Sequence, residues 1–155
     1  GLEGARHDVA LELDGIHRQA RLVGEVRPDL EKLIATALAV AADRAGELEQ
    51  SLERPIHRDA HPGQFIVGPD RALVIDVDTF ATGDPAIDLG NYSAHLSLQG
   101  VEEVDEVLLA AYGAGRALRR RVEIWHTLSL LRLSLDGLLT TGRAKSAVRA
   151  LERLK

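Results

Sequence analysis

The stretch from Ile56 to Leu96 constrains the fold more than any other part of the chain. It begins Ile-His-Arg-Asp-Ala-His-Pro-Gly-Gln and continues through two apolar runs separated by Gly-Pro-Asp-Arg. The second run ends in Val-Ile-Asp-Val-Asp and leads to Gly-Asp-Pro-Ala-Ile-Asp-Leu. Polar groups on loops between short strands are the usual way in which a protein presents reactive side chains. We therefore expect this stretch to form the functional centre.

The two apolar runs, 65–67 and 72–75, predict strands joined by a hairpin turn. Antiparallel pairing brings Gln64, which precedes the first strand, beside Asp76, which follows the second. An amide oxygen and a carboxylate suit a hard cation such as Mg²⁺. Both strands are too apolar for us to expect them at the surface. The sequence thus predicts a metal site at one end of a buried hairpin.

The spacing within the loop indicates phosphoryl transfer. Asp59 and Gln64 are five positions apart, as in a D-x-x-x-x-N catalytic loop. Such a transfer needs a base that orients a hydroxyl and oxygen ligands that hold Mg²⁺ on nucleotide phosphates. Asp59 is the natural base, and Gln64 and Asp76 are the natural ligands. Asp78 is interpreted either as a neighbour within the metal site or as a hydrogen-bonding group of the loop.

The blocks 57–64, 74–78 and 83–89, taken together, resemble the aminoglycoside phosphotransferase and choline kinase-like family. That family is a small-molecule branch of the protein-kinase-like fold. The resemblance implies that Asp59 is the catalytic base. It also implies that Gln64 and Asp76 ligate Mg²⁺ bound to ATP or another nucleoside triphosphate. The acceptor would be a hydroxyl of a small polar molecule that is aminoglycoside-, choline- or sugar-like.

The resemblance also implies supporting residues around the catalytic loop. The aspartate at Asp88 would lie on a helix and brace the loop, and the histidine at His61 would support it. The further supporting residues that we expect are His57, Arg58 and Asp84. Asp84 is also expected to cap a helix whose first residue is Pro85. Two departures from the family pattern are Gln64, where Asn is usual, and Ala60, which replaces a larger apolar residue.

The expected fold class is α+β and mostly helical, namely the C-terminal lobe of a protein-kinase-like fold packed around a small antiparallel β-hairpin. We expect one domain over 1–155, in which 1–52 are helical, 53–83 form the catalytic loop and hairpin, and 84–155 are helical. Apolar residues recur at helical spacing in most of the chain outside the hairpin. The expected helices are roughly 8–22, 27–52, one starting at Asp84, 102–113, 117–140 and one after Gly142.

Composition excludes several classes of protein. The chain of 155 residues has no cysteine, which excludes disulfides, zinc–thiolate sites and cysteine nucleophiles. A net charge of −5, with one short arginine cluster at 116–121, argues against nucleic acid as a partner. No apolar run is long enough to span a membrane, and no leader peptide is evident. By default we expect a cytoplasmic protein that does not bind a membrane.

A kinase-like enzyme also needs a nucleotide-covering lobe with a glycine-rich loop and a strand lysine. The three lysines of the chain are Lys32, Lys145 and Lys155, and none lies in a strand-like segment. We therefore expect the N-terminal nucleotide lobe to be missing from this chain, which by itself would transfer little phosphate. The interface left open by that lobe would expose apolar surface, which a homodimer could cover.

Two other functions fit the same residues. The first is a kinase-like domain that binds its ligands without catalysis and serves a regulatory role. The second is a metal-dependent phosphohydrolase built on His57, Asp59, His61 and Asp76. The acidic cluster at 102–106 could attract an amine-bearing acceptor, although a solvated helix start explains it better.

Overall fold

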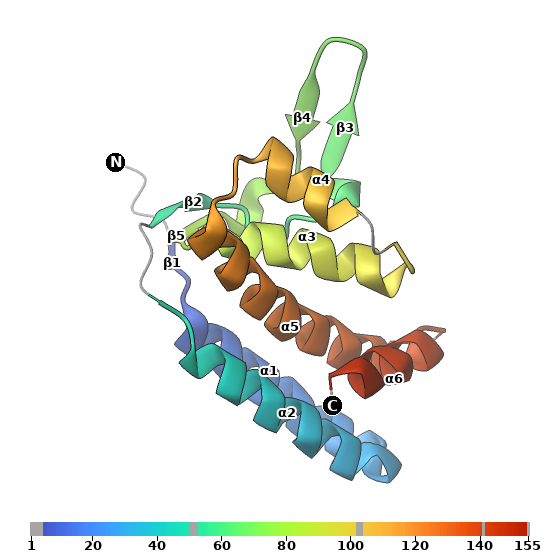
Figure 1. Cartoon of the computed structure of the whole chain (residues 1–155). Helices are drawn as coiled ribbons and strands as arrows, with labels where there is room; N and C mark the ends of the chain where they lie inside the picture. Colours follow the sequence, from blue (N-terminus) through green and yellow to red (C-terminus); the bar gives the residue numbers. More distant parts are fainter. Residues whose placement is uncertain (1–4, 50–52, 102–103, 141, 155) are drawn as a thin grey trace.

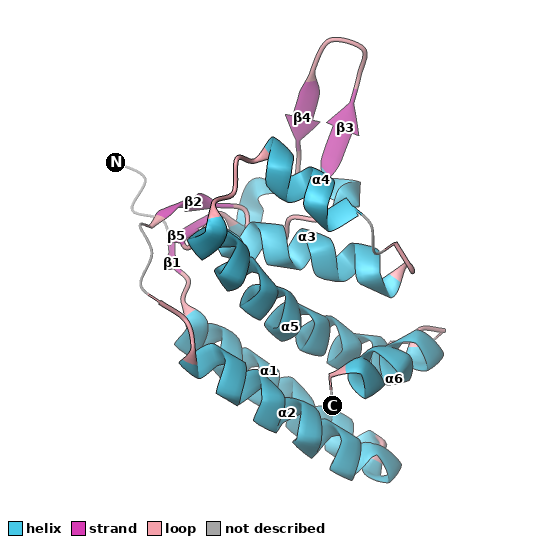
Figure 2. Cartoon of the chain, viewed as in Figure 1, coloured by secondary structure: helices cyan, strands magenta, loops and turns pink. Residues whose placement is uncertain are grey.

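The computed structural model describes residues 5–49, 53–101, 104–140 and 142–154 (Figure 1). The fold is α+β and mostly helical, and the strands are confined to one side and to a projecting hairpin (Figure 2). The helices are α1 (Val9–Val26), α2 (Glu31–Gly46), α3 (Ala86–Leu98), α4 (Val104–Ala111), α5 (Arg116–Leu139) and α6 (Ala144–Arg153). The strands are β1 (Ala5–Arg6), β2 (Arg54–Ile56), β3 (Phe65–Val67), β4 (Ala72–Val74) and β5 (Ala81–Gly83).

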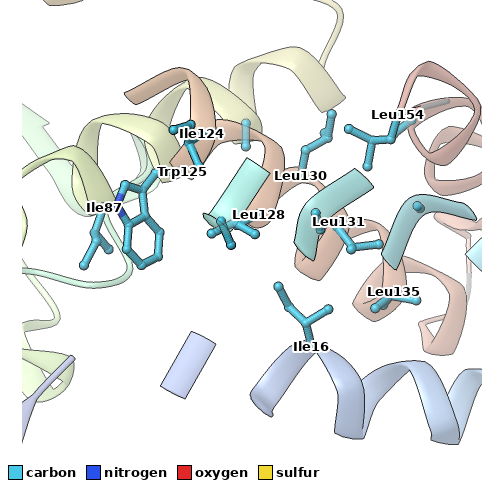
Figure 3. Close-up of a cluster of buried hydrophobic side chains, with 14 of the residues drawn as sticks. Ile16, Ile87, Ile124, Trp125, Leu128, Leu130, Leu131, Leu135 and Leu154 are labelled. Carbon is cyan, nitrogen blue, oxygen red and sulfur yellow. The ribbon is translucent and has the colours of Figure 1, made fainter. Parts of the chain in front are cut away.

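Helix α5 is the centre of the core. It lies between the α1–α2 pair on one side and α3 on the other, with α6 against its C-terminal half (Figure 1). Leu128, Leu131 and Leu135 have no exposed surface, as the helical spacing of the sequence predicts. Figure 3 shows Ile16 of α1 pointing towards these leucines. Trp125, one turn earlier, is also buried.

Helices α3 and α5 meet at Gly90. A Cβ atom added there would lie 2.6 Å from the backbone nitrogen of His126 and 2.7 Å from the carbonyl carbon of Trp125. Because these neighbours are backbone atoms, they cannot rotate out of the way as a side chain could. Glycine therefore allows the two helices to touch, and this close contact fixes α3 against the core.

Helices α1 and α2 form an antiparallel pair below α5 (Figure 1). The carboxylate of Asp8 caps α1 by accepting hydrogen bonds from the backbone N–H groups of Ala10 and Leu11, both at 3.1 Å. We expected this helix to end near residue 22, but it continues to Val26 because its buried stripe outweighs the poor helix propensity of two glycines. Helix α2 ends at Gly46, short of the expected 52, and residues 50–52 lie outside the described residues.

A three-stranded sheet, with the order β1-β5-β2, is a feature that the sequence did not predict. We expected residues 79–83 to be loop, but Ala81–Gly83 pairs antiparallel with β2 and parallel with β1. Strands of two or three residues are too short to show alternation, and this pairing joins distant segments of the chain. The sheet positions the predicted site, because β2 leads directly into the loop 57–64 and β5 leads directly into α3.

The β3–β4 hairpin forms in the predicted register, with Phe65 opposite Val74 and Val67 opposite Ala72. The expectation that it is buried was wrong, because the hairpin projects away from the helices (Figure 1). Val67 is 79% exposed, and the apolar side chains beside it are also exposed. No part of the described chain covers them, so a covering lobe or a second copy stays a prediction.

Helix α4 packs in a different phase from the one that we expected. Helical spacing predicts that Val104, Val107, Leu108 and Ala111 face inward. Leu108 does pack against the core, but Val107 is 69% exposed and Ala111 is exposed too. Leu109 is buried instead. In an eight-residue helix with apolar side chains on several faces, the pattern does not define which face is inward.

Candidate active site

The catalytic loop, residues 57–64, is bonded at both ends to the segment that follows β4. At its start, the His57 ring Nε2 lies 2.8 Å from the carbonyl oxygen of Ile75. At its end, the Ile75 N–H donates to the carbonyl of Gln64 at 3.0 Å, and the Gln64 Nε2 donates to Asp76 Oδ2 at 3.2 Å. The prediction that the hairpin brings Gln64 beside Asp76 is confirmed.

The orientation of His57 bears on one of the alternative functions. A carbonyl oxygen can only accept, so the ring Nε2 of His57 must carry the proton and donate it to Ile75. The other ring nitrogen, Nδ1, is buried. A donating Nε2 is not available to ligate a metal, and this disfavours a phosphohydrolase centre that includes His57.

Asp76 has a left-handed backbone conformation, with φ 58° and ψ 55°. Asp tolerates this conformation better than most residues, and such positions are common at functional sites. Asp78 lies in the following 3₁₀ turn, Val77–Thr79, with its side chain exposed. Within the described residues, no three His, Asp or Glu side chains lie close enough together to hold a metal ion. Gln64 and Asp76 as ligands, and Asp78 as their neighbour, therefore stay predictions.

Asp59 lies between the two anchored ends of the loop. Its side chain is 42% exposed, so a substrate hydroxyl could reach it. His61 Nδ1 accepts a hydrogen bond from the Gly63 N–H at 3.1 Å, which places the proton of the neutral ring on Nε2. That Nε2 faces Asp59 Oδ2 at 3.9 Å, which is too long for a hydrogen bond. His61 thus lies beside the Asp59 carboxylate without forming a hydrogen bond to it.

Asp88 lies on α3, where the sequence places the brace of the loop. Its carboxylate accepts hydrogen bonds from the backbone N–H groups of His57 and Arg58, both at 2.8 Å. Burial raises the pKa of the Asp88 carboxyl, against the opposing effect of these two donors. Arg58 has φ 70°, a strained conformation for a residue with a side chain. The two hydrogen bonds hold the chain in that conformation.

Asp84 precedes α3 and has two partners, and it is not the N-cap that we expected. Its Oδ1 accepts from the Ala86 N–H at 3.0 Å, and its Oδ2 pairs with Arg121 Nε at 2.7 Å. The helix begins at Ala86, so Pro85 is the cap residue and not the first helical residue that we expected. The side chains of the pair are only 12% and 14% exposed. The ion pair links the start of α3 to α5.

The arginine cluster at 116–121 forms ion pairs within the chain. Besides Arg121, Arg119 contacts both carboxylate oxygens of Glu106, at 3.0 and 2.9 Å, and Arg120 pairs with Glu47 at 3.3 Å. Glu102 and Glu103 of the acidic cluster lie outside the described residues. Because Glu106 is already paired, it is a weaker attraction for a cationic acceptor than the sequence indicated.

Sequence reasoning missed three contacts of the loop. Asn91 Nδ2 donates to the carbonyl of Ala60 at 2.9 Å, and Thr79 Oγ1 donates to the carbonyl of His57 at 2.6 Å. The His95 ring lies against the His61 ring, with 4.7 Å between centroids. Burial, with smaller contributions from His61 and Arg132, lowers the pKa of His95 to about 4. The spacing of Asp88, Asn91 and His95 on one helical face was the available signal.

Comparison with known families identifies the family of the chain. The model of the phosphotransferase enzyme family matches residues 1–125, which include the whole catalytic loop, the hairpin and α3. The chain belongs to this phosphotransferase family. The resemblance to aminoglycoside phosphotransferases and choline kinase-like enzymes is thereby confirmed. No curated protein and no solved structure matches the chain. Of the described helices, none is both long and apolar enough to cross a membrane.

Proposed function

We propose that this phosphotransferase transfers a phosphoryl group from ATP to a hydroxyl of a small polar molecule. The chain would form the C-terminal, catalytic lobe of a kinase-like protein whose nucleotide lobe lies outside the printed sequence. The single observation that supports the assignment best is the contact of Gln64 with Asp76 at the anchored end of the Asp59 loop. Family membership supports phosphoryl transfer in general, and this contact supports the residue assignment.

The residues fit a magnesium ion by the chemistry of their donor atoms. Gln64 carries an amide oxygen and Asp76 a carboxylate. The 3.2 Å contact joins the Gln64 Nε2 to Asp76 Oδ2, so the amide group would have to turn over to present its oxygen to a metal beside Asp76. None of the ion pairs formed by the described residues involves Asp76. Mg²⁺ usually takes one or two carboxylates together with substrate phosphates and water. When bound, it would neutralise charge that develops on the phosphates.

Asp59 would orient the acceptor hydroxyl and accept its proton. Its exposed carboxylate can receive a hydrogen bond from a substrate, and the anchored loop limits where that carboxylate can move. His61, with its proton on Nε2, would stabilise the carboxylate from the loop side. Positioning of this kind is the main contribution that a protein makes to phosphoryl transfer.

The test uses the complete open reading frame, radiolabelled ATP and a panel of small hydroxyl compounds. Asp59→Asn should lower the transfer rate by about 10²–10⁴-fold, the range for losing a general base, and leave nucleotide binding unchanged. Asp76→Asn should weaken Mg²⁺-dependent nucleotide binding as well. Asp70→Asn, in the exposed hairpin turn, is the matched control and should behave as wild type. Wild-type transfer by the Asp59 variant would refute the assignment.

A kinase-like domain that binds nucleotide without transfer is the second candidate. It is favoured by the Gln64 amide group, which donates to Asp76 in this structure and is one methylene longer than the usual asparagine. The same assay separates the two functions. Nucleotide binding without transfer to any acceptor, with Gln64→Asn restoring transfer, would support the second candidate.

A further inference from the structure

Helix α3 holds the catalytic loop through more than its aspartate. Three of its residues, Asp88, Asn91 and His95, contact the loop in sequence order. Asn91 is 1% exposed, so its carboxamide is removed from water and depends on partners inside the protein. Its Nδ2 donates to the carbonyl oxygen of Ala60, the residue that follows Asp59.

The orientation of Asn91 is forced by its other partner. Arg132 Nη2, on α5, donates to Asn91 Oδ1 at 2.6 Å. A guanidinium group only donates and a carbonyl oxygen only accepts, so the carboxamide cannot be turned around without losing both bonds. Arg132 therefore determines that the NH₂ group of Asn91 points at Ala60.

Arg132 is held in turn by Glu12 on α1. Its Nε donates to Glu12 Oε1 at 3.0 Å, while His7 Nε2 lies 2.9 Å from the other carboxylate oxygen. Burial opposes ionisation of Glu12, but hydrogen bonds and charges from His7 and Arg132 lower its pKa overall. Glu12 thus stays charged and fixes the planar fork of the arginine. The chain of contacts runs from α1 through α5 and α3 to the loop.

We propose that Asn91, oriented by Arg132, is a positioning residue that sets the place of the Asp59 carboxylate. Asp88 holds the backbone N–H groups just before Asp59, and Asn91 holds the carbonyl just after it. With the backbone held on both sides, the position of the Asp59 Cα atom is fixed, and with it the region that the carboxylate can reach. The effect on phosphoryl transfer rests on the proposed function, whereas the effect on the loop does not.

The variant Asn91→Asp isolates the contact. It keeps the shape of the side chain and an oxygen for Arg132, but it removes the donor to Ala60. Ser134→Ala is the control, because Ser134 lies on α5 two residues after Arg132, is fully buried, and its Oγ has no hydrogen-bond partner among the described residues. If Asn91→Asp does not fold, Arg132→Lys tests the same link, since a lysine cannot contact Glu12 and Asn91 together in the geometry of the arginine fork.

The direct readout is the NMR signal of the Ala60 carbonyl in the full-length protein. Labelling alanine carbonyls with ¹³C and histidine amides with ¹⁵N selects Ala-His pairs, and the printed chain contains two, Ala60–His61 and Ala94–His95. In Asn91→Asp the Ala60 carbonyl signal should move upfield because it loses its donor. The Ala94 signal should stay in the helical range and so report that α3 is intact.

The second readout is kinetic. A displaced base should lower kcat by about 10- to 100-fold, as a misplacement of about 1 Å can do, with an unchanged KM for nucleotide. Ser134→Ala should change neither value. The proposal is overturned if the Ala60 signal of Asn91→Asp matches that of the wild type. It is also overturned if the wild type transfers phosphate and Asn91→Asp has the same kcat. If wild type transfers no phosphate to any acceptor, the proposed function fails, and the carbonyl signal alone still decides the positioning.

Discussion

The contact between Asp88 and the catalytic loop allows a quantitative prediction. In Asp88→Asn one oxygen can still accept from a backbone N–H, but the new NH₂ group must face the other N–H. Two donors then oppose each other in a half-buried place where water cannot readily replace the lost acceptor. Arg58, with φ 70°, would also lose part of what holds it in its strained conformation.

The magnitude follows from the bonds that are lost. A hydrogen bond to a charged group contributes about 1.5–3 kcal/mol, and an unsatisfied buried donor costs about 1–3 kcal/mol. Part of this loss of stability is offset, because the variant no longer has to bury a charged carboxylate. The cost of burying that charge is what raises the pKa of Asp88. We expect Asp88→Asn to lower the free energy of unfolding by about 2–3 kcal/mol, within the usual range for a broken buried network.

The assay is urea unfolding followed by circular dichroism, with Asp136→Asn as the control. Asp136 is exposed on α5, and its loss should change the free energy of unfolding by less than about 0.5 kcal/mol. If Asp88→Asn behaves like this control, the two hydrogen bonds do not brace the loop and the reasoning is refuted.

The pH dependence gives a second check on the same residue. Because the pKa of Asp88 is raised in the folded state, the folded protein binds this proton more tightly than the unfolded chain does. That contribution to stability is largest at acidic pH and is lost as pH rises through the folded pKa. The difference in unfolding free energy between wild type and Asp88→Asn should therefore widen as pH falls through the folded pKa of Asp88. A difference that narrows would contradict a raised pKa for this group.

Two further predictions concern packing and titration. Gly90→Ala should destabilise the protein by at least about 1–3 kcal/mol, since its Cβ would meet the α5 backbone. The control is Gly24→Ala, where a Cβ meets nothing within 4 Å, and it should stabilise α1 by up to about 1 kcal/mol. If both variants shift the melting temperature equally, the close contact of Gly90 with α5 is disproved. The His95 ring should titrate at about 4 by NMR because it is buried beside His61, so stability should fall as pH drops from 6.5 towards that value. An ordinary histidine midpoint would show that the ring is exposed.

Much of the site could be predicted because its determinants are local. Two short apolar runs around a four-residue turn define a hairpin, and hairpin geometry alone brings Gln64 and Asp76 together. The stripe on α5 likewise repeats over six turns, which is long enough for its period to identify the buried face. In each case, the residues that determine the structure are neighbours along the chain or recur at a regular spacing.

Other features were decided only when distant segments met. The strand Ala81–Gly83 forms because β1 and β2 lie on either side of it, and its three residues show no pattern of their own. The link from Glu12 through Arg132 and Asn91 to Ala60 joins three helices and the loop, and no spacing in the sequence relates them. A buried polar group must find its partner wherever the packed helices place one, so such contacts depend on the tertiary structure.

The hairpin shows the same division within one element. Its strands and register follow from two short apolar runs and the turn residues between them, which are properties of the local sequence. Whether Val67 is covered depends on what packs against it, and within the described chain nothing does. Apolar character shows that a side chain prefers to leave water, but only the arrangement of the surrounding elements decides whether it can.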